Sequence, residues 1–243
     1  MPQYRQEGSI RPPPAGRPRR AVFLDRDGTL VQPHHYPSRP AHLRLYDGIG
    51  PELWRLQAAG FQLIVITNQS GLARGYFTEA DLQHMHEHLA GQLERFSLRL
   101  DGIYHCPHHV DGTVPHLAVP CDCRKPAPGM LLRAAVDLSL DLCRSWFVGD
   151  ILDDVEAGNR AGCRTVLVDL GTEGHPADSF RQPDFVARDT VHALRIIQRV
   201  EGLPPLPSAP SGPGSEDVDL TYRPPAWSPA AFAPVGGERD APD

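Results

Sequence analysis

Short apolar runs alternate with amphipathic segments along the middle of the chain. The runs that predict buried strands lie at residues 21–24, 61–66, 103–105, 146–148 and 165–168. The segments that predict helices lie at residues 51–59, 78–96, 129–140, 153–161 and 190–200. Because strands that alternate with helices are joined by right-handed crossovers, this order predicts a parallel sheet covered on both faces. The expected fold class is therefore α/β, a doubly wound, Rossmann-like domain.

Both ends of the chain lack such a pattern. Residues 1–20 and 203–243 are rich in Pro, Gly, Ser and Ala, and such segments cannot bury enough apolar area to offset the entropy of ordering. We therefore expect a disordered basic arm over residues 1–20, one folded domain over 21–202, and a disordered tail over 203–243.

The charge and composition of the chain argue against several classes of partner. The net charge is −6, so the chain has no global attraction to nucleic acid or to an anionic membrane. Nowhere do about 18 apolar residues run together, so no membrane span is expected. Arg19 and Arg20 precede only four apolar residues, which is too short for a twin-arginine export signal. We expect a cytoplasmic monomer that acts on a small metabolite.

Polar residues that could act in catalysis or binding follow the apolar runs. Each has an ordinary structural explanation when taken alone. A lone Asp-x-Asp pair, for example, is more often a turn or a helix cap. In a doubly wound sheet, however, the carboxyl ends of the strands meet in one crevice. Carboxylates there favour Mg²⁺, whereas hydroxyl, amide and cationic groups favour a phosphate. The sequence therefore predicts phosphoryl transfer by Asp25, Asp27, Thr67, Asn68, Gln69, Ser70, Arg124, Lys125 and Asp150.

Three of the five cysteines crowd into one expected loop at residues 105–125. Together with a histidine they suit tetrahedral Zn²⁺ at a closed structural site. Spacing alone leaves His108 and His109 open as the nitrogen ligand, and it also leaves open a redox-active or free pair of cysteines. The thiol ligands of this expected zinc site are Cys106, Cys121 and Cys123. The two remaining thiols, Cys143 and Cys163, are expected to be buried in the core.

The ordered motifs resemble those of the haloacid dehalogenase (HAD) superfamily. Longer matches are similar to the D-glycero-D-manno-heptose-1,7-bisphosphate 7-phosphatases and the related histidinol-phosphate phosphatases, enzymes of carbohydrate metabolism. The resemblance covers about residues 21–200. Its motifs are Asp25–Arg26–Asp27–Gly28–Thr29, Thr67–Asn68–Gln69–Ser70–Gly71, Cys106–Pro107–His108 and Cys121–Asp122–Cys123–Arg124–Lys125–Pro126.

The resemblance implies a role for each residue. Asp25 would attack phosphorus and form an aspartyl-phosphate, and Asp27 would act first as general acid and then as general base. Mg²⁺ would be held by Asp25, the backbone carbonyl of Asp27, and Asp150. The transferring oxygens would be held by Thr67 and Lys125, with Asn68, Gln69, Ser70 and Arg124 around the phosphate and substrate. The family pattern favours His108 as the zinc ligand, and Asp154 would be either a group behind the metal or a surface acid.

The match is weaker where the substrate would bind. An acid and a glycine of the heptose phosphatases are replaced by Pro33 and His35, and a lysine by Ile151. His34, His35 and Tyr36 are nevertheless candidate substrate contacts, and Gly75–Tyr76–Phe77 is a candidate border of the pocket. No large insertion follows the first or second strand, so no cap domain is expected, and the zinc loop and residues 30–45 would restrict the site. The resemblance implies heptose bisphosphate as substrate, with histidinol phosphate or another small sugar phosphate as alternatives.

Three other classes of protein compete with this interpretation. In a non-catalytic phospho-receiver, turnover would be slow, but Asp27 supplies an acid and base that receivers lack. A nucleic-acid end phosphatase would need a basic stripe, which the core sequence does not have. A zinc-organised interaction module would not need all four motifs.

Overall fold

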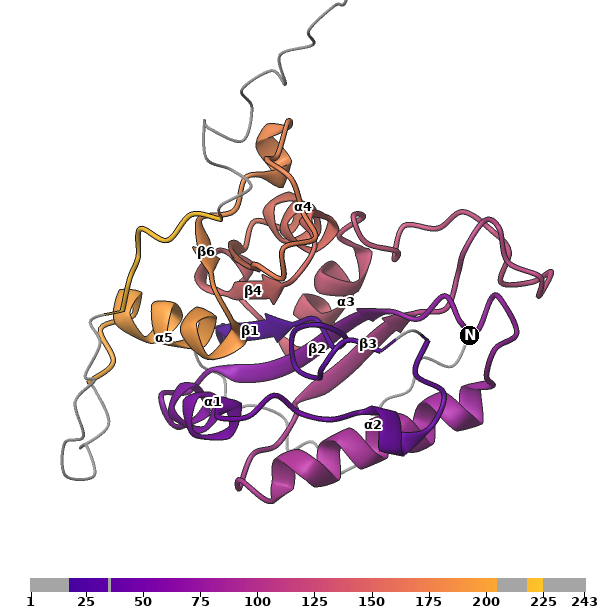
Figure 1. Ribbon diagram of the computed structural model, residues 1–243, viewed down its shortest axis with the longest axis horizontal. Coiled ribbons are helices and arrows are strands. Elements are labelled where there is room, and N and C mark those ends of the chain that lie inside the picture. The colour runs from indigo at the N-terminus through magenta and orange to yellow at the C-terminus, as the bar shows by residue number, and fades with distance from the viewer. Residues whose placement is uncertain (1–17, 35, 205–217, 225–243) are drawn as a thin grey trace, which may run out of the picture.

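The computed structural model describes residues 18–34, 36–204 and 218–224, and its centre is a six-stranded parallel sheet (Figure 1). The strands are β1 (Ala21–Leu24), β2 (Gln62–Asn68), β3 (Gly102–Cys106), β4 (Trp146–Gly149), β5 (Arg164–Val168) and β6 (Phe185–Ala187). The helices are α1 (Ile49–Ala58), α2 (Glu79–Glu94), α3 (Gly129–Leu138), α4 (Leu152–Ala161) and α5 (Thr190–Val200). The predicted α/β class is confirmed.

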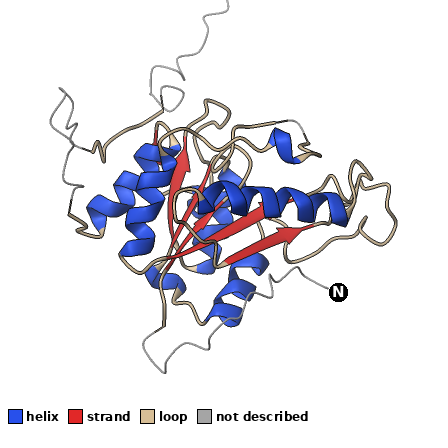
Figure 2. Ribbon diagram, turned by 90° about the horizontal axis from the view of Figure 1, so that it is seen from below, coloured by secondary structure: helices blue, strands red, loops and turns tan. Residues whose placement is uncertain are grey.

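Both faces of the sheet carry helices, as Figure 2 shows. Val22 and Leu24 of β1 pack in a core cluster with residues of α1, α2 and α5. Ala21 and Phe23 point to the other face and pack with residues of α3 and α4. This alternation explains why β1 is apolar at all four positions: its side chains enter two separate cores.

The strand order is β3-β2-β1-β4-β5-β6. β1 therefore lies between β2 and β4, and the chain winds outward from it in opposite directions. The segments that follow β1, β2 and β4 meet at one edge of the sheet, which is where ligands bind in such folds.

Boundaries differ from the predicted ones by a few residues, and one strand was missed. Thr78 caps α2 as expected, because its hydroxyl accepts a hydrogen bond from the Asp81 amide at 3.2 Å. β6 was not predicted, since three residues are too few to show a period. The segments after β1 and β2 hold no separate domain within the described residues, in agreement with the expected lack of a cap.

Parts of the expected disordered arm and tail are ordered in the structure. Arg20, in the expected arm, pairs through Nη1 with Glu201 Oε2 at 2.6 Å. In the expected tail, residues 218–224 return to the domain, where the Tyr222 hydroxyl donates to Asp169 Oδ2 at 2.7 Å. The prediction of disorder is wrong for these two parts, and most of the rest of both segments lies outside the described residues. No helix in the described part of the chain is long and apolar enough to cross a membrane.

Candidate active site

Asp25 and Lys125, a hundred positions apart in the sequence, form a buried ion pair at the edge of the sheet. The Asp25 amide continues the sheet by donating to the Val148 carbonyl of β4 at 2.9 Å. Lys125 Nζ lies 2.6 Å from Asp25 Oδ1 and 2.5 Å from Asp154 Oδ1. It also donates to the Ile66 carbonyl at 3.1 Å. All three N–H groups of the ammonium are therefore placed, and the lysine side chain is only 3% exposed.

Asp25, Asp150 and Asp154 form a cluster in which one oxygen from each carboxylate lies within 4.8 Å of the others. Burial, followed by the charges of Asp154 and Asp27, raises the pKa of Asp25 to about 7 even though Lys125 opposes the shift. Burial and the charges of Asp25 and Asp154 raise the pKa of Asp150 to about 8. Crowded buried carboxylates of this kind are stabilised by a divalent cation, and oxygen ligands suit Mg²⁺. The residues fit such an ion.

Two glycines allow these carboxylates to approach the backbone. A Cβ on Gly28 would lie 2.3 Å from Asp150 Oδ2, and Gly28 also has a φ of +87°. A Cβ on Gly149 would lie 2.3 Å from the Asp154 side chain. The Thr29 hydroxyl then donates to Asp150 Oδ1 at 3.2 Å. The Asp-x-Asp-Gly-Thr and Gly-Asp sequences are thus required by the packing of the site itself.

Asp154 is not a surface acid. Its side chain is 1% exposed, and it faces Lys125 from the first turn of α4. Burial raises its pKa, while the Lys125 charge opposes that rise. This burial excludes the surface-acid alternative, and a role behind the metal stays a prediction.

Asp27 is held by two neighbouring groups. Its Oδ2 accepts from Arg26 Nε at 3.0 Å and Nη2 at 2.7 Å, and from Gln69 Nε2 at 3.1 Å. Gln69 Nε2 also donates to the Thr67 hydroxyl at 2.8 Å. Gln69 therefore contacts the acidic residue and the hydroxyl that were predicted to flank the phosphate.

Asn68 supports Lys125 through the backbone. Its Oδ1 accepts from the Lys125 amide at 3.1 Å, and its Nδ2 donates to the Lys125 carbonyl at 3.2 Å. Both ends of the amide are used, so Asn68 fixes the loop that carries the lysine. Ser70 is partly exposed at the start of the next turn.

The segment after β1 meets the segment after β2 through aromatic rings. The Tyr36 ring contacts that of Tyr76 edge to face, with centroids 4.7 Å apart. His34 stacks on His42 at 4.2 Å, and His35 lies outside the described residues. Tyr36 and Tyr76 therefore lie together, and their place at the border of a substrate pocket stays a prediction.

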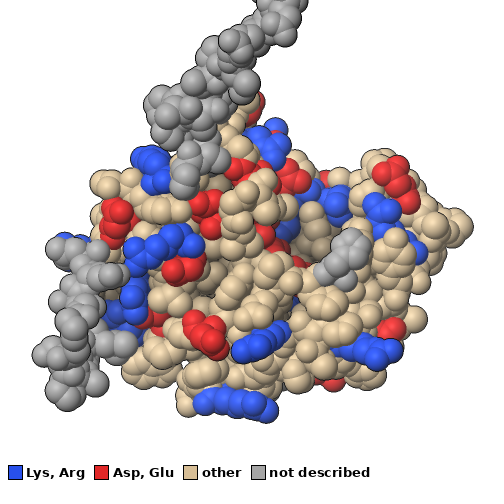
Figure 3. Space-filling view, in the orientation of Figure 1, with Lys and Arg blue, Asp and Glu red and all other residues tan. Residues whose placement is uncertain are grey.

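A positively charged group around His109 includes one arginine, Arg74, that sequence reasoning missed. Arg74 Nη2 lies 3.2 Å from His109 Nε2, and Arg124 Nη1 donates to the His108 carbonyl at 3.5 Å. Burial and both arginine charges lower the pKa of His109. Figure 3 shows acidic and basic side chains around a hollow in this face of the molecule. The position of Arg74 just after the Thr67–Asn68–Gln69–Ser70–Gly71 motif was the signal that could have identified it.

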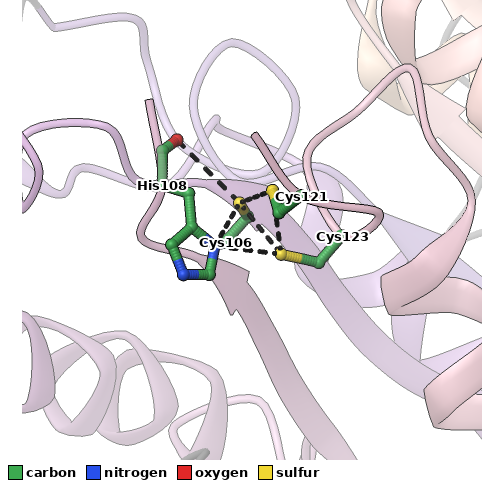
Figure 4. Close-up of side chains that lie close together, drawn as sticks. All are labelled: Cys106, His108, Cys121 and Cys123. Carbon is green, nitrogen blue, oxygen red and sulfur yellow. Dashed lines mark hydrogen bonds between the residues drawn. The ribbon is translucent and has the colours of Figure 1, made fainter. Parts of the chain in front are cut away.

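The Cys106 loop forms a compact cluster of three sulfurs and one nitrogen (Figure 4). Cys106 Sγ lies 3.6 Å from Cys121 Sγ and 3.2 Å from Cys123 Sγ, and the latter two lie 3.4 Å apart. His108 Nδ1 lies 3.4 Å from Cys123 Sγ. In a tetrahedral zinc site with Zn–S bonds of about 2.3 Å, ligand atoms are separated by about 3.8 Å. The cluster therefore fits a zinc ion with little movement.

The other sulfur and nitrogen candidates are also placed. His109 faces Arg74 and accepts from the Asp111 amide at 3.1 Å, so His108 is the histidine in the cluster. Every cysteine is a free thiol, so no disulfide competes with metal binding. Cys163 is buried as expected, but Cys143 is exposed. The prediction for Cys143 is wrong because it lies in a short 3₁₀ turn, Leu142–Arg144, at the surface.

Mg²⁺ should stabilise the protein more at high pH than at low pH. The folded chain holds protons on Asp25 and Asp150 up to about pH 7 and 8, whereas the unfolded chain loses them near 3.8. Stability from these protons is complete below the unfolded pKa and is lost as the pH rises through the folded values. Because Mg²⁺ replaces the protons, we expect its increment in melting temperature to be larger at about pH 8 than at about pH 6.

Scanning calorimetry with and without Mg²⁺ at both pH values measures this difference. Asp150→Asn should reduce the increment in melting temperature at both pH values. The matched control is Asp153→Asn, which changes a half-exposed acid in the first turn of α4 and should leave the increment unchanged. An equal increment at the two pH values would contradict the coupling between protons and metal.

Comparison with known proteins identifies the family. The HAD-hyrolase-like family model matches residues 122–193. The D-glycero-beta-D-manno-heptose-1,7-bisphosphate 7-phosphatase of Escherichia coli K12 is 45% identical over 152 residues, which are 62% of this chain and 80% of that protein. The enzyme of the same name from Haemophilus ducreyi is 42% identical over 181 residues, covering 74% of this chain and 98% of the relative.

A solved structure gives the same answer. The D,D-heptose 1,7-bisphosphate phosphatase of B. bronchiseptica, complexed with magnesium and phosphate, matches with a TM-score of 0.63 and 31% identity. The match covers 74% of this chain and 99% of that one. With the fold, the motifs and the relatives in agreement, the chain is a phosphatase that belongs to the heptose-bisphosphate phosphatase family of the HAD superfamily.

Proposed function

We propose that the chain hydrolyses the 7-phosphate of D-glycero-β-D-manno-heptose 1,7-bisphosphate, the reaction that names its relatives. The observation that carries the proposal is the buried Asp25–Lys125–Asp154 group with Asp150 beside it. It joins a nucleophile, a cation for phosphate and a set of oxygen ligands for Mg²⁺ at one point. Location in the cytoplasm and a monomeric state stay predictions.

Asp25 attacks the phosphorus, forming an O–P bond while the bond from phosphorus to the ester oxygen breaks. Asp27 gives its proton to the departing oxygen and then, as a carboxylate, takes a proton from the water that attacks the aspartyl-phosphate. Thr67 and Lys125 hold the transferring oxygens, and Asp154 keeps Lys125 in place. Asp25, Asp150 and the Asp27 backbone carbonyl would hold Mg²⁺, which would supply positive charge that lets an anionic nucleophile approach an anionic phosphate.

We assign the second metal a structural role. Four ligands from Cys106, His108, Cys121 and Cys123 would leave no position for water, which is typical of closed zinc sites. Zinc would fix the loop whose next two residues are Arg124 and Lys125. Its contribution to catalysis is therefore the placement of that pair.

The substrate choice rests on charge at the border of the site. Arg74 and Arg124 both lie close to His109, and two guanidinium groups suit a second phosphate, since Arg binds phosphate through paired hydrogen bonds. Histidinol phosphate and other sugar monophosphates carry no second phosphate to bind there. This cationic border favours a bisphosphate over both alternatives.

Phosphate release from the heptose bisphosphate, histidinol phosphate and simple sugar monophosphates, measured with and without Mg²⁺, tests the substrate. We expect Mg²⁺-dependent turnover with the highest kcat/KM for the bisphosphate. Arg74→Gln should raise KM for the bisphosphate by on the order of tenfold and leave monophosphates nearly unchanged, because one charge-assisted contact contributes about 1.5–3 kcal/mol. Higher kcat/KM for histidinol phosphate would overturn the assignment, and turnover of none of them would favour a phospho-receiver or an interaction module.

A further inference from the structure

Arg26 is a fully buried cation beside the expected acid and base. Its side chain is 0% exposed, whereas the side chain of Asp27 is 28% exposed. Two nitrogens of the guanidinium, Nε and Nη2, both donate to the same atom, Asp27 Oδ2. Asp27 is the only acidic partner of Arg26 among the described residues.

A buried guanidinium is costly unless it has a specific task. Replacing a buried ion pair by apolar groups is often neutral or stabilising, because desolvation can exceed the attraction. One nitrogen of Arg26, Nη1, has no hydrogen-bond partner within the described structure. The nearby His86 has no negative charge to offset the guanidinium, and burial together with the Arg26 charge lowers the pKa of His86 well below its usual value. Fold stability therefore gives a weak account of Arg26.

The contacts on Asp27 are divided unequally between its two oxygens. Oδ2 accepts from Arg26 twice and from Gln69 Nε2 once. Oδ1 is buried and has no partner in the part of the chain that the structure describes. Because Oδ1 faces the interior, the donors to Oδ2 fix the orientation of the whole carboxylate, which is what proton transfer requires.

From these contacts we infer that Arg26 is the positioning residue of the acid and base, holding the Asp27 carboxylate in the orientation from which it exchanges a proton with the ester oxygen and then with water. The inference rests on the role proposed for Asp27. When the P–O bond breaks, its electron pair stays on the ester oxygen, which takes the proton from the Asp27 carboxyl group. Gln69 assists by holding the same oxygen from the β2 side.

Leaving groups distinguish this role from a structural one. An alkyl phosphate, such as the heptose ester, leaves as a strongly basic oxygen and needs the proton, whereas an aryl phosphate such as p-nitrophenyl phosphate leaves without it. Arg26→Met keeps the volume and removes the guanidinium. Because general acid catalysis contributes about 10²–10⁴-fold, we expect kcat/KM for the alkyl ester to fall on the order of 10- to 100-fold. For the aryl ester, kcat/KM reports only the formation of the aspartyl-phosphate and should change by less than about threefold.

A double-mutant cycle completes the test. In the Asp27→Asn background the Arg26→Met change should have no further effect on alkyl-ester turnover, because residues that act through one another are not additive. Arg26→Lys keeps the positive charge but loses the paired hydrogen bonds of the guanidinium, so it should recover only part of the activity. The matched control is Arg20→Met, which removes an arginine ion pair of 2.6 Å at the other end of β1 and should preserve the ratio of alkyl to aryl turnover.

Two results would overturn the inference. Equal losses for alkyl and aryl esters in Arg26→Met would show a general structural role, and additive effects in the cycle would show that Arg26 acts independently of Asp27. Failure of the proposed function looks different, because wild-type protein would then release no phosphate from either ester, or would prefer histidinol phosphate while the contrast between alkyl and aryl esters in Arg26→Met persisted.

Discussion

Asp25→Asn is expected to remove phosphatase activity, lowering kcat on the order of 10⁴-fold or more, as loss of a covalent nucleophile does in other enzymes. The amide has the size and shape of the carboxylate but cannot form an acyl phosphate, so chemistry is lost while the volume of the site is kept. Lys125 retains Asp154 as a partner at 2.5 Å, which limits the charge left unpaired. Steady-state phosphate release with saturating Mg²⁺ measures the loss.

The fold of this variant must be checked alongside. Melting temperature should change modestly, because the buried ammonium keeps one carboxylate and the Ile66 carbonyl. Asp153→Asn, which alters a half-exposed acid that pairs with Arg181, should keep full activity. Turnover by Asp25→Asn at a tenth or more of the wild-type rate would refute the assignment of the nucleophile.

Loss of one thiol of the zinc cluster is the second large effect that we expect. Cys121→Ser should reduce the zinc content from about one ion per chain to near zero, since a structural site depends on its full ligand set. The melting temperature should fall and phosphatase activity with it, because Arg124 and Lys125 directly follow the cluster. Elemental analysis and calorimetry on the same preparations measure both.

Cys143→Ser is the matched control, because this thiol is exposed and lies outside the cluster. It should keep the zinc, the melting temperature and the activity. If Cys121→Ser retained zinc at the wild-type ratio, or if wild-type protein held none, the four residues would not form a zinc site.

The sequence predicted the framework because the framework is built from local patterns. Five of the six strands follow from short apolar runs, and the site motifs follow from what stands at their ends. β1 shows the reason: its four residues enter two cores, so every position is apolar and the acid that follows stands out. β6 shows the limit, since a three-residue strand at the sheet edge leaves almost no pattern.

The parts of the site that were missed depend on contacts between distant segments. Asn68 was expected near the phosphate, yet both ends of its amide hold the backbone of Lys125, 57 positions away. Whether Asp154 faces solvent or the site depends on how α4 is rotated against β4, and this rotation cannot be predicted from the local sequence. Arg74 becomes noticeable only when the zinc loop brings His109 against it.

The tail shows a different limit. Residues 218–224 have a composition typical of disorder, but Val218 and Leu220 pack against the core, and the Asp219 carbonyl lies 2.8 Å from His192 Nε2. A few apolar residues suffice when the domain supplies the rest of the contact surface. The average composition of the segment does not reveal these few apolar residues.

The claim on which the account depends is that Asp25 carries the phosphoryl group during turnover. Wild-type protein and the Asp27→Asn variant, quenched in acid while the heptose bisphosphate is being consumed, can be digested and searched by mass spectrometry for the phosphorylated carboxylate. We expect the phosphoryl group on Asp25, at higher occupancy in Asp27→Asn, where the attack of water is slowed. A phosphoryl group on Asp150 or Asp154, or steady turnover with no phosphorylated aspartate in either protein, would contradict the account.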